Sequence, residues 1–173
     1  GLADRIEVRM GPGLTVLAPG EAACVAICGM GGPLIARILD DGPLDGVARL
    51  VLQPMGGEAQ LRRWLAEHGW HLVAEEIVAD GGRLYPVLVA EPGRMELTRA
   101  EEEVGPLLLR QGGALVQRHV AEKLALARRA LAGAERSDSP AARARAAELA
   151  ELVRVLSEVA ASPGSRGGPS PPG

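Results

Sequence analysis

An apolar segment that passes directly into a glycine-rich turn and then into a helical pattern constrains the fold more than any other feature. Cys24–Cys28 is wholly apolar, Gly29-Met30-Gly31-Gly32 follows at once, and Pro33–Leu39 has the apolar spacing of a helix. A short run without polar residues is typical of a central strand covered on both faces. Pro33 suits a first helical turn, where its missing N–H costs no hydrogen bond. The segment therefore predicts a β-α unit.

The same pattern occurs a second time further along the chain. Arg49–Gln53, which ends at Pro54, predicts another apolar strand. Glu58–His68 carries apolar residues at helical spacing, and Gly69 follows as a helix-terminating residue. Two consecutive β-α units favour a parallel sheet, because a helix brings each strand back to the same starting edge.

A hairpin follows these units. The strand-like runs 71–80 and 83–91 are separated only by Gly81-Gly82, which is typical of a two-residue turn between antiparallel strands. Ile6–Met10, before the first unit, alternates apolar and charged residues as a half-buried strand does. The whole order predicts an α/β fold in which a parallel sheet ends in an antiparallel hairpin.

The C-terminal part of the chain changes to helix-forming residues. Apolar side chains recur every three or four residues over 115–131 and again over 141–160. Ser139-Pro140 lies between them as an N-cap serine with a first-turn proline. This predicts an antiparallel helical hairpin of the coiled-coil type. The predicted domains are an α/β domain over 1–95, the helical hairpin over 96–160, and a disordered Ser-Pro-Gly tail over 161–173.

Composition excludes several classes of protein. The 173 residues have a formal net charge of -3, which excludes a strongly cationic nucleic-acid binder, so any nucleic-acid surface must be a local patch. No apolar run reaches the roughly 18 residues of a membrane span, and no signal peptide opens the chain, so we expect a soluble, cytoplasmic protein. Cys24 and Cys28 lie about 13 Å apart on a strand, too far for a disulfide, and we expect both to be small buried hydrophobes.

Three predicted strand ends outline a candidate crevice. Gly11-Pro12-Gly13, Cys28-Gly29-Met30 and Gln53-Pro54 each follow a predicted strand. Ligands of open parallel sheets bind outside the carboxyl ends of the strands, and glycine lets the backbone approach them. A tight strand-to-helix turn explains the glycines equally well. The sequence offers no acid/base pair and no metal-ligand cluster, and His68 and His71 are expected to be surface residues.

The order of these motifs resembles the bacterial tRNA (adenine(22)-N1)-methyltransferase family. Residues 27–39 resemble its "AGMGG-x-LI-x-x-IL" segment, and 49–54 resemble its "LILQP" strand. Residues 63–70 are similar to its next helix, and Tyr85 with 87–89 to its tyrosine-containing hairpin strand. Residues 97–108 resemble the segment that leads into its helical hairpin, and 1–9 resemble its third strand.

The resemblance implies a Rossmann-like class I methyltransferase sheet, S-adenosyl-L-methionine as cofactor, and tRNA as partner. Adenine N1 has its own lone pair, so the protein mainly flips and orients the base. Oligomeric state is left open. The residues that the resemblance and the strand ends implicate in catalysis are Cys28, Gly29, Met30, Gln53 and Pro54; those implicated in cofactor binding are Gly11, Gly13, Leu14, Gly29 and Met30.

Two departures from the family pattern bear on activity. The family's two N-terminal β-α units, with the main cofactor loop and a ribose-binding acidic residue, have no counterpart in residues 1–173. Its "GDGL" motif is here Gly11-Pro12-Gly13-Leu14, in which Pro12 supplies neither a side-chain acceptor nor an N–H. We therefore expect this chain by itself to be an inactive or incomplete form of the enzyme.

Basic residues of the predicted helical hairpin are the candidates for tRNA binding. They are Arg118, Lys123, Arg128 and Arg129. Residues 98–160 contain ten basic and nine acidic residues, so a solvated helical surface is an equal alternative. Two other function classes stay open: a non-catalytic RNA-binding or protein-interaction module that retains a methyltransferase remnant, and a plain dimerisation domain.

Overall fold

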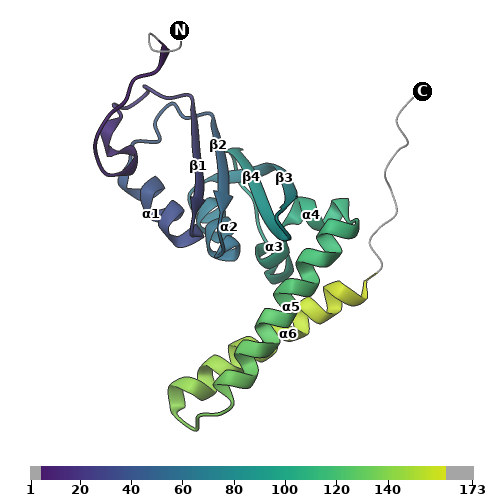
Figure 1. Cartoon of the computed structure of the whole chain (residues 1–173). Helices are drawn as coiled ribbons and strands as arrows, with labels where there is room; N and C mark the ends of the chain where they lie inside the picture. The colour runs from purple at the N-terminus through teal and green to yellow at the C-terminus, as the bar shows by residue number, and fades with distance from the viewer. Residues whose placement is uncertain (1–4, 163–173) are drawn as a thin grey trace, which may run out of the picture. The chain divides into compact units, whose positions relative to one another are not determined.

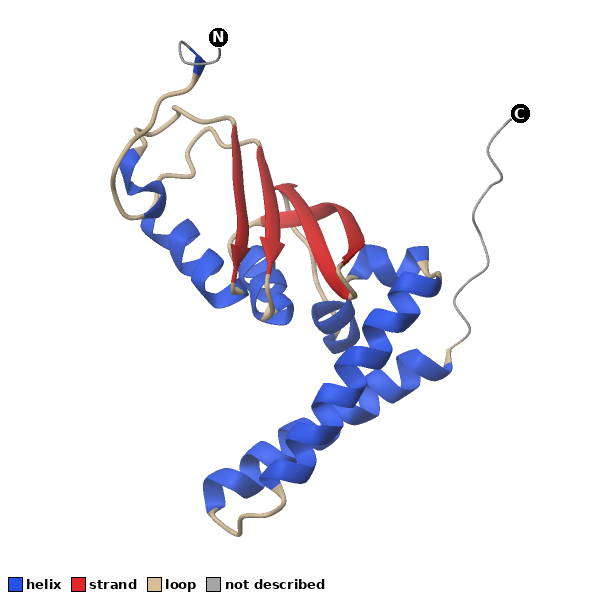
Figure 2. Cartoon of the chain, in the orientation of Figure 1, coloured by secondary structure: helices blue, strands red, loops and turns tan. Residues whose placement is uncertain are grey.

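The computed structural model describes residues 5–162 and divides them into two compact units (Figures 1 and 2). The first unit holds residues 5–74 and 86–95, and the second holds 75–85 and 96–162. The first unit ends at residue 95, and residues 75–85 of the hairpin group with the helices of the second unit. Of the tail predicted over 161–173, Ala161 is instead the last residue of a helix and Ser162 follows it as the C-cap, and residues 163–173 lie outside the described residues.

The sheet has four strands among the described residues. They are β1 (Cys24–Met30), β2 (Arg49–Pro54), β3 (Trp70–Asp80) and β4 (Arg83–Pro92), in the order β1-β2-β4-β3. β1 and β2 are parallel, and β4 runs antiparallel to β2. The prediction of an α/β fold with parallel strands and an antiparallel hairpin is confirmed.

One face of β1 and β2 is buried by helices α1 (Gly32–Asp41) and α2 (Glu58–Glu67). Both helices were predicted within two residues of their ends. Alternate strand residues point toward them, and the buried side chains include Val25, Ile27, Leu50, Leu52, Ile35, Leu39, Leu61 and Leu65.

Two predictions about the first strands are wrong. Cys24 and Cys28 are exposed, because β1 alternates and only Val25 and Ile27 face the helices. β1 is thus covered on one face within the described residues. Ile6–Met10 forms no strand, and its apolar side chains are exposed. No neighbouring strand among the described residues lies beside this segment, so its backbone N–H and C=O groups have no strand with which to form hydrogen bonds.

The Gly-Gly hairpin turn forms as predicted. Gly81 and Gly82 have φ values of 52° and 78°, and both lie in the left-handed region. A two-residue turn of this kind requires positive φ at both positions to match the twist of the strands. The sequence Gly-Gly therefore defines where β3 ends and β4 begins.

The second unit contains four helices among the described residues. They are α3 (Arg99–Val104), α4 (Pro106–Gln111), α5 (Ala114–Ala134) and α6 (Pro140–Ala161). The long pair α5 and α6 lie side by side and are joined by a turn (Figure 1). Ser139 caps α6, since its hydroxyl accepts the Ala142 N–H at 3.2 Å, as predicted. None of the described helices is both long and apolar enough to cross a membrane.

The short helices α3 and α4 were not predicted, although a signal for α3 is present. Thr98 and Glu101 form a capping box in which each side chain accepts the other residue's backbone N–H. Glu75 of β3 is buried, and its carboxylate accepts the N–H of Leu107 at 2.9 Å. A Cβ on Gly105 would lie 2.6 Å from the same carboxylate, so glycine is required where β3 meets the junction of α3 and α4.

Aliphatic side chains form the core of the second unit. They come from α3, α4, α5 and α6: Val104, Leu108, Val116, Val120, Leu124, Ala127 and Leu156. Leu156 of α6 is completely buried in this core, and Leu152, Val153 and Val159 of the same helix pack against it while partly buried. The packing of α6 on α5 therefore depends strongly on Leu156.

We expect Leu156→Ala to lower the free energy of unfolding of the helical unit by about 2–5 kcal/mol, because it leaves a cavity in this core. Urea unfolding followed by circular dichroism at 222 nm measures the change. Leu126, on α5, is 62% exposed, and Leu126→Ala is the matched control with an expected change below about 0.5 kcal/mol. Equal losses in the two variants would contradict the assignment of the core.

Candidate functional site

The loops that follow β1 and β2 are joined by backbone hydrogen bonds. The Met30 carbonyl accepts the Met55 N–H at 2.8 Å, and the Gly56 carbonyl accepts the Gly32 N–H at 2.7 Å. A Cβ on Gly32 would lie 2.3 Å from the carbonyl oxygen of Gly57. The two loops therefore form one rigid edge at the carboxyl ends of the parallel strands.

The side-chain amide of Gln53 forms hydrogen bonds with the backbone at the ends of both strands. Its Oε1 accepts the Gly29 N–H at 2.9 Å, and its Nε2 donates to the Pro54 carbonyl at 3.0 Å. Both ends of the amide are thus engaged by the loops. The Gln53 side chain therefore holds the Gly29 backbone and does not project freely from the strand end.

An apolar rim surrounds the edge. Met30, Leu34 and Met55 are 40%, 48% and 49% exposed. Gly29 has φ 77°, and no atom lies within 4 Å of the position that a Cβ would take. Thioethers are polarisable and make favourable contacts with aromatic rings, so these exposed side chains suit packing against a planar heterocycle. Of the other predicted catalytic residues, Cys28 is exposed on the same strand end, whereas Pro54 is buried beneath it.

The predicted cofactor residues Gly11, Gly13 and Leu14 are not part of this edge. A Cβ on Gly13 would meet Ile38 at 2.9 Å, and one on Gly42 would meet Leu14 at 2.3 Å. Both contacts lie at the C-terminal half of α1, whereas the rim lies at its N-terminus. The prediction that all three strand ends meet in one crevice is wrong for residues 11–13 in this structure, because no strand precedes them among the described residues.

An ion-pair network holds the segment before these residues. The Arg9 guanidinium binds both oxygens of Glu21, pairs with Glu7 at 2.6 Å, and donates to the Val16 carbonyl at 3.1 Å. These hydrogen bonds from Arg9, helped by the Ala18 N–H, lower the pKa of Glu21 to about 2. The ionised Glu21 carboxylate therefore stabilises the folded segment at pH values above 4.5, the ordinary pKa of this group. This stabilisation is lost as the pH falls toward 2.

The predicted RNA-binding residues occur in two environments. Arg118 pairs with Glu122 at 2.8 Å and also donates to the Gly82 carbonyl, and the Lys123 ammonium lies 3.8 Å from Glu103. Arg128 and Arg129 are exposed, and no ion pair involves them within the described residues. The latter two therefore keep their charge available to a ligand.

The two histidines of the first unit do not form a metal site. His68 stacks on Trp64 with ring centroids 4.2 Å apart and contacts the Trp64 carbonyl through Nδ1 at 2.7 Å. His71 contacts the Glu91 carbonyl at 3.0 Å. Across residues 5–162 no group of three or more His, Cys, Asp or Glu side chains is arranged to hold a metal.

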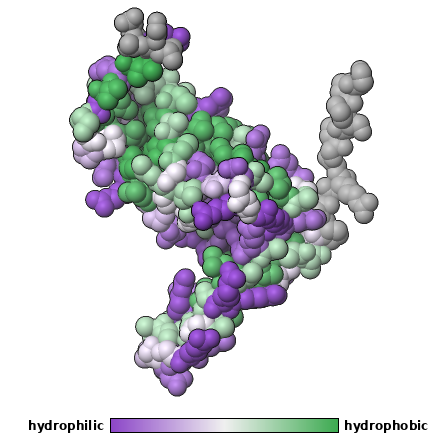
Figure 3. All heavy atoms as spheres, in the orientation of Figure 1, coloured by the Kyte–Doolittle hydropathy of each residue, from purple (hydrophilic) through white to green (hydrophobic). Residues whose placement is uncertain are grey.

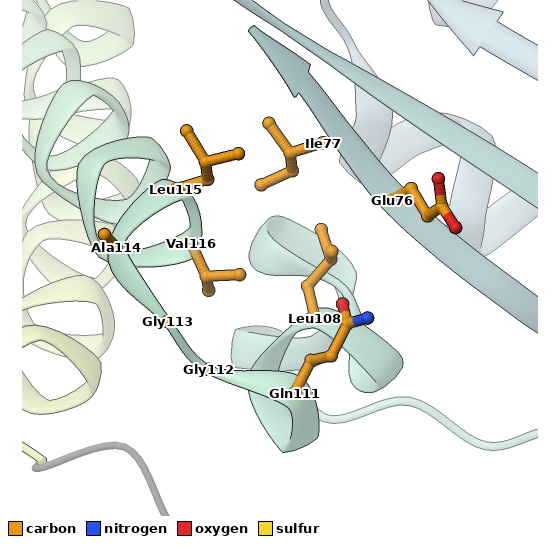
Figure 4. A pocket seen from close by; sticks show the side chains of 9 residues that line it. All are labelled: Glu76, Ile77, Leu108, Gln111, Gly112, Gly113, Ala114, Leu115 and Val116. Carbon is orange, nitrogen blue, oxygen red and sulfur yellow. The ribbon is translucent and has the colours of Figure 1, made fainter. Parts of the chain in front are cut away.

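A cavity of about 350 Å³ in the second unit was not predicted (Figure 4). Side chains of Ile77, Leu108, Leu115 and Val116 converge on it, and Gln111 lies at its margin. Glu76 is the one charged residue of its lining, and within the described residues it belongs to no group of three or more side chains that could hold a metal. The chemistry of the candidate site therefore belongs to the loops after β1 and β2.

We expect Gly32→Ala to lower the free energy of unfolding by about 1–3 kcal/mol, because the new Cβ collides with the Gly57 carbonyl. Gly133→Ala, in α5, is the control: its Cβ meets no atom within 4 Å, and the expected change is a gain of about 0.5–1 kcal/mol. Denaturant unfolding of the three proteins gives the comparison. A Gly32→Ala protein as stable as the parent would show that the loops are not packed this closely.

In an Arg9→Gln variant we expect the pKa of Glu21 to rise from about 2 toward 4.5, since the charged donor is gone. NMR chemical shifts of the side-chain carboxyl groups, followed against pH, give this value. The pKa of Glu151, which Arg154 lowers, serves as the internal control and must not change. A Glu21 pKa that stays near 2 would refute the role of Arg9.

The sequence of this chain matches a known protein family. The chain matches the family model described as tRNA (adenine(22)-N(1))-methyltransferase over residues 1–158. It is 34% identical over 168 residues to the tRNA (adenine(22)-N(1))-methyltransferase of Bacillus subtilis, covering 92% of this chain and 71% of that protein.

Solved structures agree with this match. The crystal structure of the Bacillus subtilis enzyme superposes with a TM-score of 0.82 at 32% identity, covering 92% of this chain and 72% of that one. Streptococcus pneumoniae Sp1610 in complex with S-adenosyl-L-methionine gives 0.78 at 32% identity, with 92% and 71% covered. A Streptococcus agalactiae protein of the NADB-Rossmann superfamily gives 0.80 at 34% identity, with 92% and 70% covered. The fold is Rossmann-like, and the chain belongs to the tRNA (adenine(22)-N(1))-methyltransferase family.

Proposed function

We propose that this chain serves the transfer of a methyl group from S-adenosyl-L-methionine to N1 of adenine 22 in tRNA. The observation that carries the proposal is the family match over residues 1–158, which includes both loops of the candidate site. The Streptococcus pneumoniae relative with bound S-adenosyl-L-methionine supports the choice of cofactor.

The described residues suit the acceptor side of this reaction better than the cofactor side. The exposed thioethers of Met30 and Met55, beside the open Gly29 backbone, offer apolar surface on which a base can pack. Gly11, Gly13 and Leu14, proposed for the cofactor from the family motif, lie along α1 away from this rim. Their role stays a proposal, together with that of Gly29 and Met30 in cofactor contact.

Methyl transfer to adenine N1 requires no acid or base catalysis from the side chains at the rim. S-adenosyl-L-methionine, when bound, supplies an electrophilic methyl group. Adenine N1 carries a free lone pair and needs no general base, which fits a site without an acid/base pair. We assign the Met30 and Met55 side chains to packing against the adenine ring and the backbone at Cys28, Gly29 and Met30 to its polar edge. Gln53, which accepts the Gly29 N–H and rests above the buried Pro54, positions that backbone.

The helices supply the tRNA-contacting domain in this proposal. We propose that residues 1–95 form the catalytic domain and that 96–160 form the tRNA-binding domain, with α5 and α6 as an antiparallel coiled coil. The packing of Leu156 against the apolar stripe of α5 supports this geometry. Of the four basic residues predicted for RNA binding, Arg128 and Arg129 are the proposed RNA contacts, because they are exposed and no ion pair involves them within the described residues. Arg118 and Lys123 have acidic partners, and their part in RNA binding stays a prediction.

A second function is favoured by one specific observation. The cofactor candidates are separated from the rim, and Pro12 replaces the family's acidic residue. A non-catalytic module that keeps the RNA-binding surface would show this separation. The two proposals differ in methyl transfer and not in tRNA binding.

The assay uses the whole product of the gene that encodes this chain, with the polypeptide of residues 1–173 beside it. We expect the whole product to transfer a labelled methyl group to a tRNA transcript with adenine at position 22, and not to one with guanine there. The polypeptide of residues 1–173 is expected to transfer none by itself. The Bacillus subtilis relative is the positive control.

Two outcomes would contradict the proposal. A whole product that binds the transcript and transfers no methyl group would favour the non-catalytic module. Equal methylation of the adenine and guanine transcripts would place the target elsewhere in the tRNA. Methylation by residues 1–173 alone would support the proposed reaction and refute our expectation that this polypeptide is inactive by itself.

A further inference from the structure

The charges of the α5–α6 hairpin are divided between its two ends. We infer that the turn end, formed by Arg128, Arg129, Arg136 and Arg143, is the surface that binds RNA phosphates, and we call it the arginine tip. The inference rests on the proposed function for the identity of the RNA as tRNA. It goes beyond that function by assigning the contact to one end of the hairpin and to two residues, Arg136 and Arg143, that the sequence analysis did not select.

At the end of the hairpin remote from the turn, basic side chains face acidic partners. Arg118 pairs with Glu122 at 2.8 Å on α5. Arg154 pairs with Glu151 at 2.6 Å and with Glu158 on α6. Each of these arginines therefore has its charge compensated within the same helix, which leaves little net attraction for a polyanion.

The neighbouring α3 follows the same pattern. Arg99 pairs with Glu102 and Glu103 at 2.9 and 3.0 Å, and the Lys123 ammonium is 3.8 Å from Glu103. The Glu103 carboxylate thus serves two cations. Residues 98–124 contain four basic and four acidic residues, so this part of the unit has no net charge.

The turn end has the opposite balance. Residues 125–147 contain five arginines against two acidic residues, whereas 148–162 contain one arginine against three. Of the five, Arg145 alone has an ion pair recorded within the described residues, with Glu148 at 2.9 Å. The four residues of the arginine tip are exposed and have none within residues 5–162. Hydrophilic side chains lie along this end of the hairpin in Figure 3.

The acidic residues near the tip do not neutralise it. Glu135 and Asp138 lie in the turn itself and are exposed, and no ion pair involves them within the described part of the chain. Their two charges leave the tip with a net excess of positive charge. The C-terminus of α5 carries a partial negative charge and the N-terminus of α6 a partial positive charge. Because the two ends meet at the same turn, these partial charges offset each other and do not change the balance.

Phosphate is the ligand that this arrangement fits. Arginine presents a rigid fork of donors that matches phosphate oxygens, and an exposed guanidinium without a partner has no intramolecular bond to break before it binds. Arg128 and Arg129 lie 14 and 15 residues after the start of α5, or about 21–22 Å along the helix. The tip is therefore a surface of its own, well separated along α5 from the compensated end.

The test compares two variants with the same loss of charge. The tip variant carries Arg128→Gln, Arg129→Gln, Arg136→Gln and Arg143→Gln. The control carries four substitutions at exposed arginines that have ion pairs: Arg37→Gln, Arg99→Gln, Arg145→Gln and Arg154→Gln. Circular dichroism establishes that both remain helical. Affinity for an unmodified tRNA transcript is measured from about 50 to 200 mM salt, where phosphate contacts dominate the salt dependence.

We expect the tip variant to lose affinity at least about tenfold at the lowest salt, and the slope of log affinity against log salt to fall by roughly 0.7–0.9 for each phosphate that is no longer neutralised. The control is expected to keep the slope of the parent. Equal losses in both variants would show that only net charge matters and would overturn the inference. Unchanged binding by the tip variant, or no binding by the parent at low salt, would also overturn it.

A third variant, with Arg118→Gln and Lys123→Gln, tests which end of the hairpin binds RNA, through its loss of affinity for the same transcript. A larger loss of affinity than in the tip variant would put the phosphate surface at the compensated end and overturn the inference. If the tip instead serves an acidic protein surface, the tip variant binds the transcript like the parent. This test measures RNA affinity only. If the gene product transferred no methyl group, the proposed function would fail, and the affinities of these variants would still decide whether the arginine tip binds RNA.

Discussion

The close approach of Gly32 to the Gly57 carbonyl is the contact on which the candidate site depends. It brings the start of α1 against the loop that leads into α2, so both helices begin at the same edge of the sheet. Met30 and Met55 are then joined through their backbones, and their side chains are left outside. A side chain at position 32 would separate the loops, and the apolar rim would lose its common base. Gly32 therefore serves the close packing of the two loops.

Local signals in the sequence predicted most of the fold. Gly81-Gly82 defined the hairpin, because only glycine adopts the required φ values readily. Ser139-Pro140 marked the start of α6 through its cap. Both signals act over three or four residues, so they can be read without knowledge of the rest of the chain. The helix α3 carried the same kind of signal in Thr98 and Glu101, and six residues of helix are too few for periodicity to support it.

Predictions that depended on neighbours in space were less successful. The apolar character of Cys24–Cys28 says that a strand is there, but not how many of its faces are covered. Ile6–Met10 has the alternation of a strand and no partner among the described residues. For the site, the loops after β1 and β2 were placed together, since parallel strands end at one edge. That the Gln53 amide is bound to the loops, and that Arg118 is paired, depends on contacts that no spacing reveals.

The outward orientation of Cys24 and Cys28 has a practical consequence. Both thiols stand on the uncovered face of β1, about 13 Å apart along the strand, and no other cysteine occurs in the chain. Their rate of alkylation is thus a chemical footprint of that face alone. A polypeptide or ligand that covers this face of the sheet is expected to slow the labelling, so the two thiols report on whatever binds there.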